Sequence, residues 1–206
     1  MLRSDSGDRA GLLTAGRVRV TAVAMVLLLT ALGAVFVLQG WQPWQGRAII
    51  GTRLHTFPAV DSADLTATQA RVVEIAEHEF DGQASGLKYS DGVDEPWCAD
   101  FVSWVMLNAD QPLTNPNTGS WRIPGVATLE DFYSTAGRLR TAASGYQPNI
   151  GDVVLYNEAS PFGQHTNIVL SNDQGVLTTI GGNEGNDIRI HQFVLADTTG
   201  IVGFGV

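Results

Sequence analysis

The sequence predicts an α+β fold with N-terminal helices packed on an antiparallel sheet of about five strands, preceded by a single transmembrane helix. Apolar residues recur with helical spacing up to about residue 136, whereas from Gly151 they alternate with a period of two in short runs. Helices followed by strands are typical of a sheet covered by helices on one face. Upstream of both patterns, one uncharged stretch is long enough to cross a bilayer.

The uncharged stretch runs from Val20 to Leu38 and would span about 28 Å as a helix. A cleavable signal peptide is the alternative, but its apolar region is usually about 7–15 residues long and ends at a small-x-small site, which is missing after Leu38. We therefore expect an uncleaved anchor. More arginines precede it than closely follow it, so the N-terminus should stay in the cytoplasm and the rest should be extracytoplasmic.

This reading divides the chain into four parts. They are a cytoplasmic tail (1–19), a transmembrane signal anchor (20–39), an extracellular tether (40–66) and a globular domain (67–206). Apolar residues of the tether near positions 48–50 and 54–57 could dock on the domain.

Charge limits the partners of the extracytoplasmic part. Eight basic and 19 acidic residues follow residue 19, a net charge of −11. Such an acidic surface argues against nucleic acid or anionic lipid as a partner, and protein partners are left open.

Three helices are expected. The first runs from about Ala67 to Phe80 after a cap at Asp64 or Thr66, and a short third helix lies near 128–136. The second, over about 96–108, carries Cys98, the chain's single cysteine. This helix is expected to begin at residue 96 or 97, because proline is tolerated in a first helical turn.

Helical spacing places Cys98 in the middle of an apolar arc. Its neighbours in this arc are Phe101, Val102, Val105 and Met106. A thiol in this place points toward whatever the helix packs against, at a helix start that favours the thiolate. Outside the membrane thiols are usually paired, so a lone cysteine is either a buried small hydrophobe or a working thiol, and on the count alone the first is the commoner.

The strands are expected as an antiparallel meander of five runs. These are 152–157, 165–171, 176–180, 188–193 and 201–204. If residues 173–175 form a three-residue hairpin loop, His165 lies opposite Asn183 on one face, where the amide could orient the imidazole. A slip of one residue would instead bring Gly182 opposite the histidine.

Other polar residues are given no catalytic or metal role. His55, His78 and His191 lie in no patterned context and are taken as structural or solvated. The acids of the loop over 91–95 do not match a calcium-loop pattern, and we expect no metal and no cofactor.

Four motifs in order resemble the CHAP family, the cysteine- and histidine-dependent amidohydrolases/peptidases of the NlpC-type, papain-like superfamily. They are Trp-Cys98-Ala-Asp-Phe-Val-Ser-Trp-Val, Gly151-Asp-Val-Val, Gly163-Gln-His165-Thr-Asn-Ile-Val and Thr-Ile-Gly-Gly-Asn183. The resemblance covers about residues 67–206. It implies a papain-like fold with Cys98 as nucleophile, His165 as base, Asn183 as orienter and bacterial peptidoglycan as the usual substrate.

The chain departs from this family at one position of the site. Many members have Glu two residues before this Asn, where the chain has Gly181. Glu184 follows Asn183, but continued alternation would point it to the opposite face, so it is not assigned the role.

The sequence thus predicts a membrane-anchored extracytoplasmic cysteine hydrolase that cleaves amide bonds in peptidoglycan through a Cys98-His165-Asn183 triad and a thioester acyl-enzyme. The bond is either that of an N-acetylmuramoyl-L-alanine amidase or one in the stem peptide or cross-bridge. The backbone N–H of Cys98 and the Tyr89 hydroxyl are candidate oxyanion donors. The alternatives are a non-catalytic peptidoglycan-binding module of the same fold, a thiol peptidase acting on a protein, and a scaffold with a structural cysteine.

Overall fold

The computed structural model describes residues 49–61 and 63–206. The predicted tail, the predicted anchor over 20–39 and the first part of the predicted tether lie outside these residues. Within them, no helix is both long and apolar enough to cross a membrane. The anchor therefore stays a prediction.

The three expected helices are present as α2 (Ala67–Gly82), α3 (Cys98–Asn108) and α4 (Val126–Thr135). The cap of α2 is Thr66, whose hydroxyl accepts from the Gln69 backbone N–H while the Gln69 side chain accepts from the Thr66 N–H. Trp97 is the N-cap of α3, so this helix begins at Cys98, slightly later than predicted. The cysteine is thereby its first residue.

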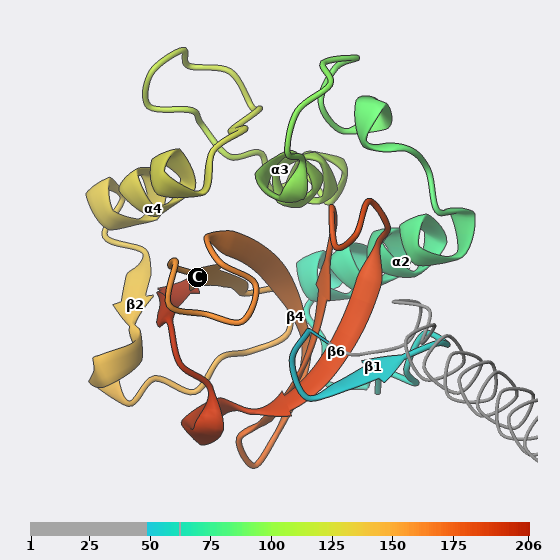
Figure 1. Ribbon diagram of the computed structural model, residues 1–206, viewed down its shortest axis with the longest axis vertical. Coiled ribbons are helices and arrows are strands. Elements are labelled where there is room, and N and C mark those ends of the chain that lie inside the picture. The colour runs from blue at the N-terminus through green and yellow to red at the C-terminus, as the bar shows by residue number, and fades with distance from the viewer. Residues whose placement is uncertain (1–48, 62) are drawn as a thin grey trace, which may run out of the picture. The chain divides into compact units, whose positions relative to one another are not determined.

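Within the described residues the sheet has seven antiparallel strands, two more than predicted. They are β1 (Thr52–Leu54), β2 (Leu139–Thr141), β3 (Val153–Tyr156), β4 (His165–Asp173), β5 (Val176–Gly181), β6 (Arg189–Val194) and β7 (Ile201–Gly205). Their order is β1-β6-β5-β4-β3-β7-β2, part of which is visible in Figure 1. The five predicted runs are β3 to β7, and the two added strands have three residues each, too few to show alternation.

The predicted meander holds only from β3 to β6. These strands pair in chain order, but β7 pairs with β3 instead of β6, with Val153 opposite Gly205. The last strand therefore lies on the far side of β3, where β2 then adds to it.

Strand β1 lies within the stretch predicted as a tether. It pairs with β6, with Arg53 opposite His191. Gly51 precedes it with a φ of 51°, and a Cβ there would lie 2.1 Å from the Gln192 carbonyl oxygen. Only glycine permits this close approach, which holds the segment of residues 50–54 against β6.

The helices cover one face of the sheet, as the sequence predicted, and a second apolar core lies on the other face. Val153 and Leu155 belong to the core under the helices, and Val154 and Tyr156 to a second core on the other face. Helix α3 packs on β4 and β5 and touches α2 and α4. Its side chain Phe101 is fully buried, and burial of a side chain of this size contributes roughly 1.5–3 kcal/mol.

The β4–β5 hairpin reaches the predicted register by a different route. Asp173 lies opposite Val176, so the loop is the two-residue turn Gln174-Gly175, with both φ values positive. A bulge between Val169 and Ser171 then shifts the pairing by one residue and restores the predicted alignment. Pairing of β5 with β4 ends at Ile180, before the alignment reaches His165.

Candidate active site

Cys98 is the first residue of α3 and is 6% exposed. The preceding Trp97 is stacked on Tyr89 with a centroid distance of 5.3 Å, and both rings are buried. Gly86 lies against this indole, because a Cβ there would come within 2.3 Å of the ring. The first N–H groups of a helix have no intrahelical acceptor, so the helix presents free donors beside the thiol.

The proposed role of Tyr89 as an oxyanion donor is not supported. Its hydroxyl donates to Glu79 Oε2 at 2.6 Å, and the same carboxylate binds Lys88. Tyr89 therefore anchors the loop before α3 to α2.

His165 begins β4, opposite Tyr156, and its ring is stacked on Phe162 with a centroid distance of 4.8 Å. Burial opposes the charged ring. The Cys98 thiol and then the Glu184 carboxylate, which both face the ring, outweigh burial and raise the pKa of His165 to about 9. The structure thus brings the predicted nucleophile and the predicted base together.

Glu184 faces the Nε2 side of the His165 ring, whereas we expected its side chain to point to the opposite face of the sheet. Its Oε1 lies 3.5 Å from His165 Nε2, the separation of an ion pair rather than of a short hydrogen bond. Strand β5 ends at Gly181, and Asn183 has a left-handed φ of 61°. The alternation of side chains between the two faces does not continue through such a turn, so the Glu184 carboxylate lies on the side of His165.

The contact with His165 that an orienting Asn183 would make is not seen in the structure. Between the described residues His165 and Asn183 no hydrogen bond is found. Asn183 instead lines a groove beside Trp97 and Asn186, and the Trp97 indole N–H donates to Asn186 Oδ1 at 3.3 Å. A catalytic role for Asn183 remains a prediction that its variants can test.

Gly181 explains how Glu184 reaches His165. An added Cβ at 181 would lie 2.7 Å from Glu184 Oε1 and 2.1 Å from Asn167 Oδ1. The carboxylate from 184 therefore occupies the space beside the position where many CHAP sequences carry their Glu.

The sequence analysis missed the surroundings of His191. This residue on β6 is fully buried, and its Nε2 lies 2.5 Å from Glu184 Oε2. Its Nδ1 lies 3.2 Å from the Ile50 carbonyl oxygen. In the sequence, the only sign of this role was the place of His191 in an alternating run, next to Ile190. Its burial depends on β1, and that strand was not predicted.

Glu184 is ionised by this arrangement although it is buried. Burial would raise its pKa, but the facing rings of His165 and His191 together lower it below the ordinary value for a glutamate. Cys98, His165, Glu184 and His191 thus form a continuous buried polar line from the start of α3 to the Ile50 carbonyl.

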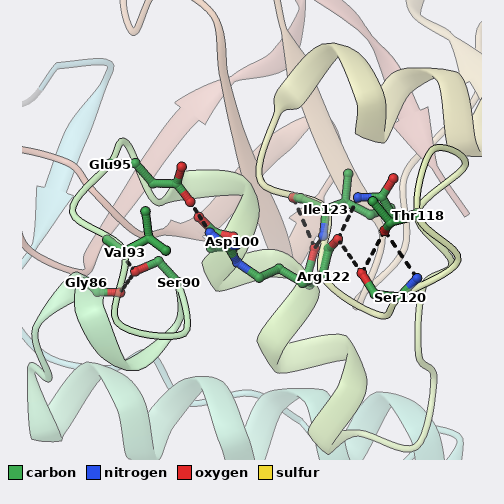
Figure 2. Close-up of polar contacts among 11 residues, drawn as sticks. Gly86, Ser90, Val93, Glu95, Asp100, Thr118, Ser120, Arg122 and Ile123 are labelled. Atoms are coloured by element: carbon green, nitrogen blue, oxygen red, sulfur yellow. Dashed lines mark hydrogen bonds and ion pairs between the residues drawn. The ribbon is translucent and has the colours of Figure 1, made fainter.

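Arg122 braces the first turn of α3, as Figure 2 shows. Its guanidinium binds Glu95 and lies 2.8 Å through Nε from Asp100 Oδ1. Asp100 is fully buried, and burial raises its pKa to about 6 despite the guanidinium. One helical turn further on, the Ile123 N–H donates to Ser103 Oγ at 3.2 Å, which holds the same loop on the helix.

A groove of about 450 Å³ adjoins the polar line. It is lined by residues 85–87, 93–97, 183 and 186, so it contains the chain neighbours of both Cys98 and Glu184. Leu87 and Val93 leave exposed apolar surface at its edge. Among residues 49–61 and 63–206 no three His, Cys, Asp or Glu side chains are grouped in a way that would hold a metal ion.

Comparison with known families agrees with this geometry. The family model of the CHAP domain matches residues 89–183. The chain carries a CHAP domain. Neither the curated proteins nor the solved structures contain a match to the chain. The matched region of the CHAP domain includes Cys98 and His165 and ends at Asn183, one residue before the carboxylate that contacts the histidine.

Proposed function

We propose that this protein is a membrane-anchored extracytoplasmic cysteine hydrolase that cleaves amide bonds in bacterial peptidoglycan. The observation that carries the proposal is the buried line of Cys98, His165 and Glu184 at the start of α3 in a CHAP domain. It offers a candidate nucleophile, a base beside it and a carboxylate at ion-pair distance from that base.

The reaction is acyl transfer to water. His165 takes the thiol proton, the thiolate attacks the amide carbonyl, and the free N–H groups at the start of α3, that of Cys98 among them, stabilise the oxyanion. The imidazolium returns the proton to the leaving amine, leaving a thioester on Cys98. Water activated by the neutral His165 then attacks the thioester and regenerates the thiol.

Glu184 stabilises the imidazolium and fixes the ring orientation in this scheme. A buried carboxylate beside a histidine plays this part in the nucleophile-base-orienter arrangement. The raised pKa of His165 means that its protonated form persists well above neutral pH, as the return of a proton to an amine requires.

The groove beside Trp97 supports an extended substrate. Its volume of about 450 Å³ is in the range of small-ligand sites, and its edge combines apolar Leu87 with polar Asn183 and Asn186. Such a lining suits a peptide strand, whether the scissile bond is the sugar-to-alanine amide or lies in the stem or cross-bridge.

Location is the second support for a wall substrate. An uncharged stretch over 20–38 with arginines before it favours an anchor with the catalytic domain on the extracytoplasmic side, where peptidoglycan is within reach.

Digestion of purified sacculi by the full chain tests the proposal, with mass spectrometry of the released fragments identifying the bond. The matched control is Cys98→Ala, which removes the nucleophile and little volume. We expect fragments with new amino groups from the parent and none from the folded control. Equal release by both would refute the thiol mechanism, whereas binding of sacculi by both without release would establish the non-catalytic module in its place.

A further inference from the structure

His191 has a hydrogen-bond acceptor at each ring nitrogen. Nδ1 lies 3.2 Å from the Ile50 carbonyl oxygen, and Nε2 lies 2.5 Å from Glu184 Oε2. A carbonyl oxygen only accepts hydrogen bonds, so Nδ1 carries a proton. Nε2 faces the ionised Glu184 carboxylate, which also only accepts, so Nε2 carries a proton too and the charged ring donates from both nitrogens. This contact is the shorter of the two that the carboxylate makes with a histidine.

The two oxygens of Glu184 are divided between two histidines. Oε1 faces His165 at 3.5 Å and Oε2 faces His191 at 2.5 Å. A carboxylate held at both ends has one orientation, so His191 determines where Oε1 points. The carboxyl group has no freedom to turn away from His165 while this contact persists.

The proposed reaction requires Glu184 to stay in place while the charge of His165 changes, and His191 can provide this support. His165 alternates between the charged and the neutral ring during each turnover. When it is neutral, Glu184 loses one of its two charged partners, and a buried carboxylate left without any partner would be strongly unfavourable. His191 makes no contact with the thiol and keeps its hydrogen bond through both stages.

We propose that His191 is a positioning residue that holds the Glu184 carboxylate against His165 throughout the reaction. The proposal rests on the proposed function of the Cys98 site. It assigns His191 an indirect role, through Glu184, with no contact to substrate.

The segment before β1 completes this support. The Ile50 carbonyl fixes the Nδ1 proton of His191, and Gly51 allows the segment to lie against the Gln192 carbonyl. The titratable groups facing His191 and its carboxylate are His165 from β4, Arg53 from β1 and Tyr156 from β3. Residues that join the predicted anchor to the domain thus take part in the support of the site.

The test compares His191→Phe with His191→Gln in the full chain. Phenylalanine keeps the ring volume and removes both donors, whereas the glutamine amide can still donate to Glu184 from about the place of Nε2. We expect kcat on sacculi to fall about 10–100-fold in His191→Phe, the usual size of an effect on a supporting partner, with KM nearly unchanged. His191→Gln should recover at least tenfold of that loss.

Alkylation of Cys98 by iodoacetamide gives a readout that needs no substrate. At pH 6 the parent should react through its thiolate-imidazolium pair, and His191→Phe should react about tenfold more slowly. If sacculi stay intact with every protein but this difference appears, the proposed function fails and the positioning role stands. The matched control is His78→Phe, at an exposed histidine of α2, which should behave as the parent.

Displacing the segment at Ile50 provides a variant that leaves the histidine in place. Gly51→Ala adds a Cβ that would lie 2.1 Å from the Gln192 carbonyl, whereas Gly119→Ala introduces similar backbone strain at φ 76° with no atom within 4 Å. We expect slower alkylation at pH 6 in Gly51→Ala than in Gly119→Ala.

Three outcomes would overturn the proposal. One is a folded His191→Phe with the parent's kcat and alkylation profile. Another is a folded His191→Gln as impaired as His191→Phe, since the hydrogen bond would then be irrelevant. The third is equal alkylation of Gly51→Ala and Gly119→Ala, because the Ile50 carbonyl would then have no part in holding the ring.

Discussion

In the variant Glu184→Gln, the fall of kcat/KM at high pH should begin at a lower pH than in the parent. The change keeps the side-chain shape and removes the charge that faces His165 at 3.5 Å. The ring's pKa rises from 6.5 to about 9 in the protein, which corresponds to about 3 kcal/mol in favour of the imidazolium, net of burial. Cys98 and Glu184 share this stabilisation, so loss of Glu184 should remove about one pKa unit or more.

The direction of this pH shift follows from the proton that the leaving amine requires. The imidazolium donates it, so kcat/KM should fall as pH rises through the pKa of the thiol-histidine pair. In the parent this limb should lie near pH 9, the pKa of His165. In Glu184→Gln it should lie near pH 8, and kcat should fall roughly 10²–10⁴-fold, as for other histidines that lose their carboxylate.

The assay is release of dye-labelled fragments from sacculi between pH 5 and 10. The matched variant is Asn183→Gly, because alanine at a φ of 61° would add backbone strain whereas glycine adds none. It should keep the parent's limb. A limb that stays near pH 9 in Glu184→Gln but moves in Asn183→Gly would refute the reasoning and return the orienting role to Asn183.

Three further predictions concern stability and location. Gly181→Ala should lower the free energy of unfolding by about 1–3 kcal/mol in urea titrations, since its methyl would lie 2.1 Å from Asn167 Oδ1, whereas Gly82→Ala, with open space around it, should not. Asp100 has a pKa raised to about 6, so the folded state holds its proton longer than the unfolded state, and stability should fall by at most about 3 kcal/mol as pH rises from 4 to 7. Asp100→Asn should lack this decline in parallel urea titrations, and an equal decline in both proteins would assign it to other groups. Membranes washed with carbonate should retain the full chain, whereas a soluble form beginning near residue 40 would refute the anchor.

Elements with a strong period could be predicted from the sequence. The 16 residues of α2 and the nine of β4 contain enough turns or alternations for the pattern to be clear, and the Thr66 cap has a side chain that fits its role. Strands β1 and β2 have three residues each and exist because longer strands offer them an edge. Pairing of that kind is a tertiary effect, which local pattern does not contain.

The same limit explains what was missed at the site. Cys98 and His165 could be found because each lies at the boundary of a well-patterned element. The burial of His191 follows from β1 docking on β6, a strand that the sequence did not predict within the tether, so that histidine was taken only as structural or solvated. The unpredicted edge strand β1 thus concealed the burial of a histidine on the neighbouring strand β6.

The glycine at position 181 and the position of the Glu184 carboxylate depend on each other. Any side chain at 181 would collide with the carboxylate from 184 and with Asn167 Oδ1, so the strand end must carry glycine once the carboxylate comes from beyond the turn. The left-handed Asn183 reverses the chain at the point where alternation would have sent Glu184 away from His165. In this chain the carboxylate beside the histidine therefore comes from Glu184, three residues beyond the position at which the resemblance to the CHAP family places a glutamate.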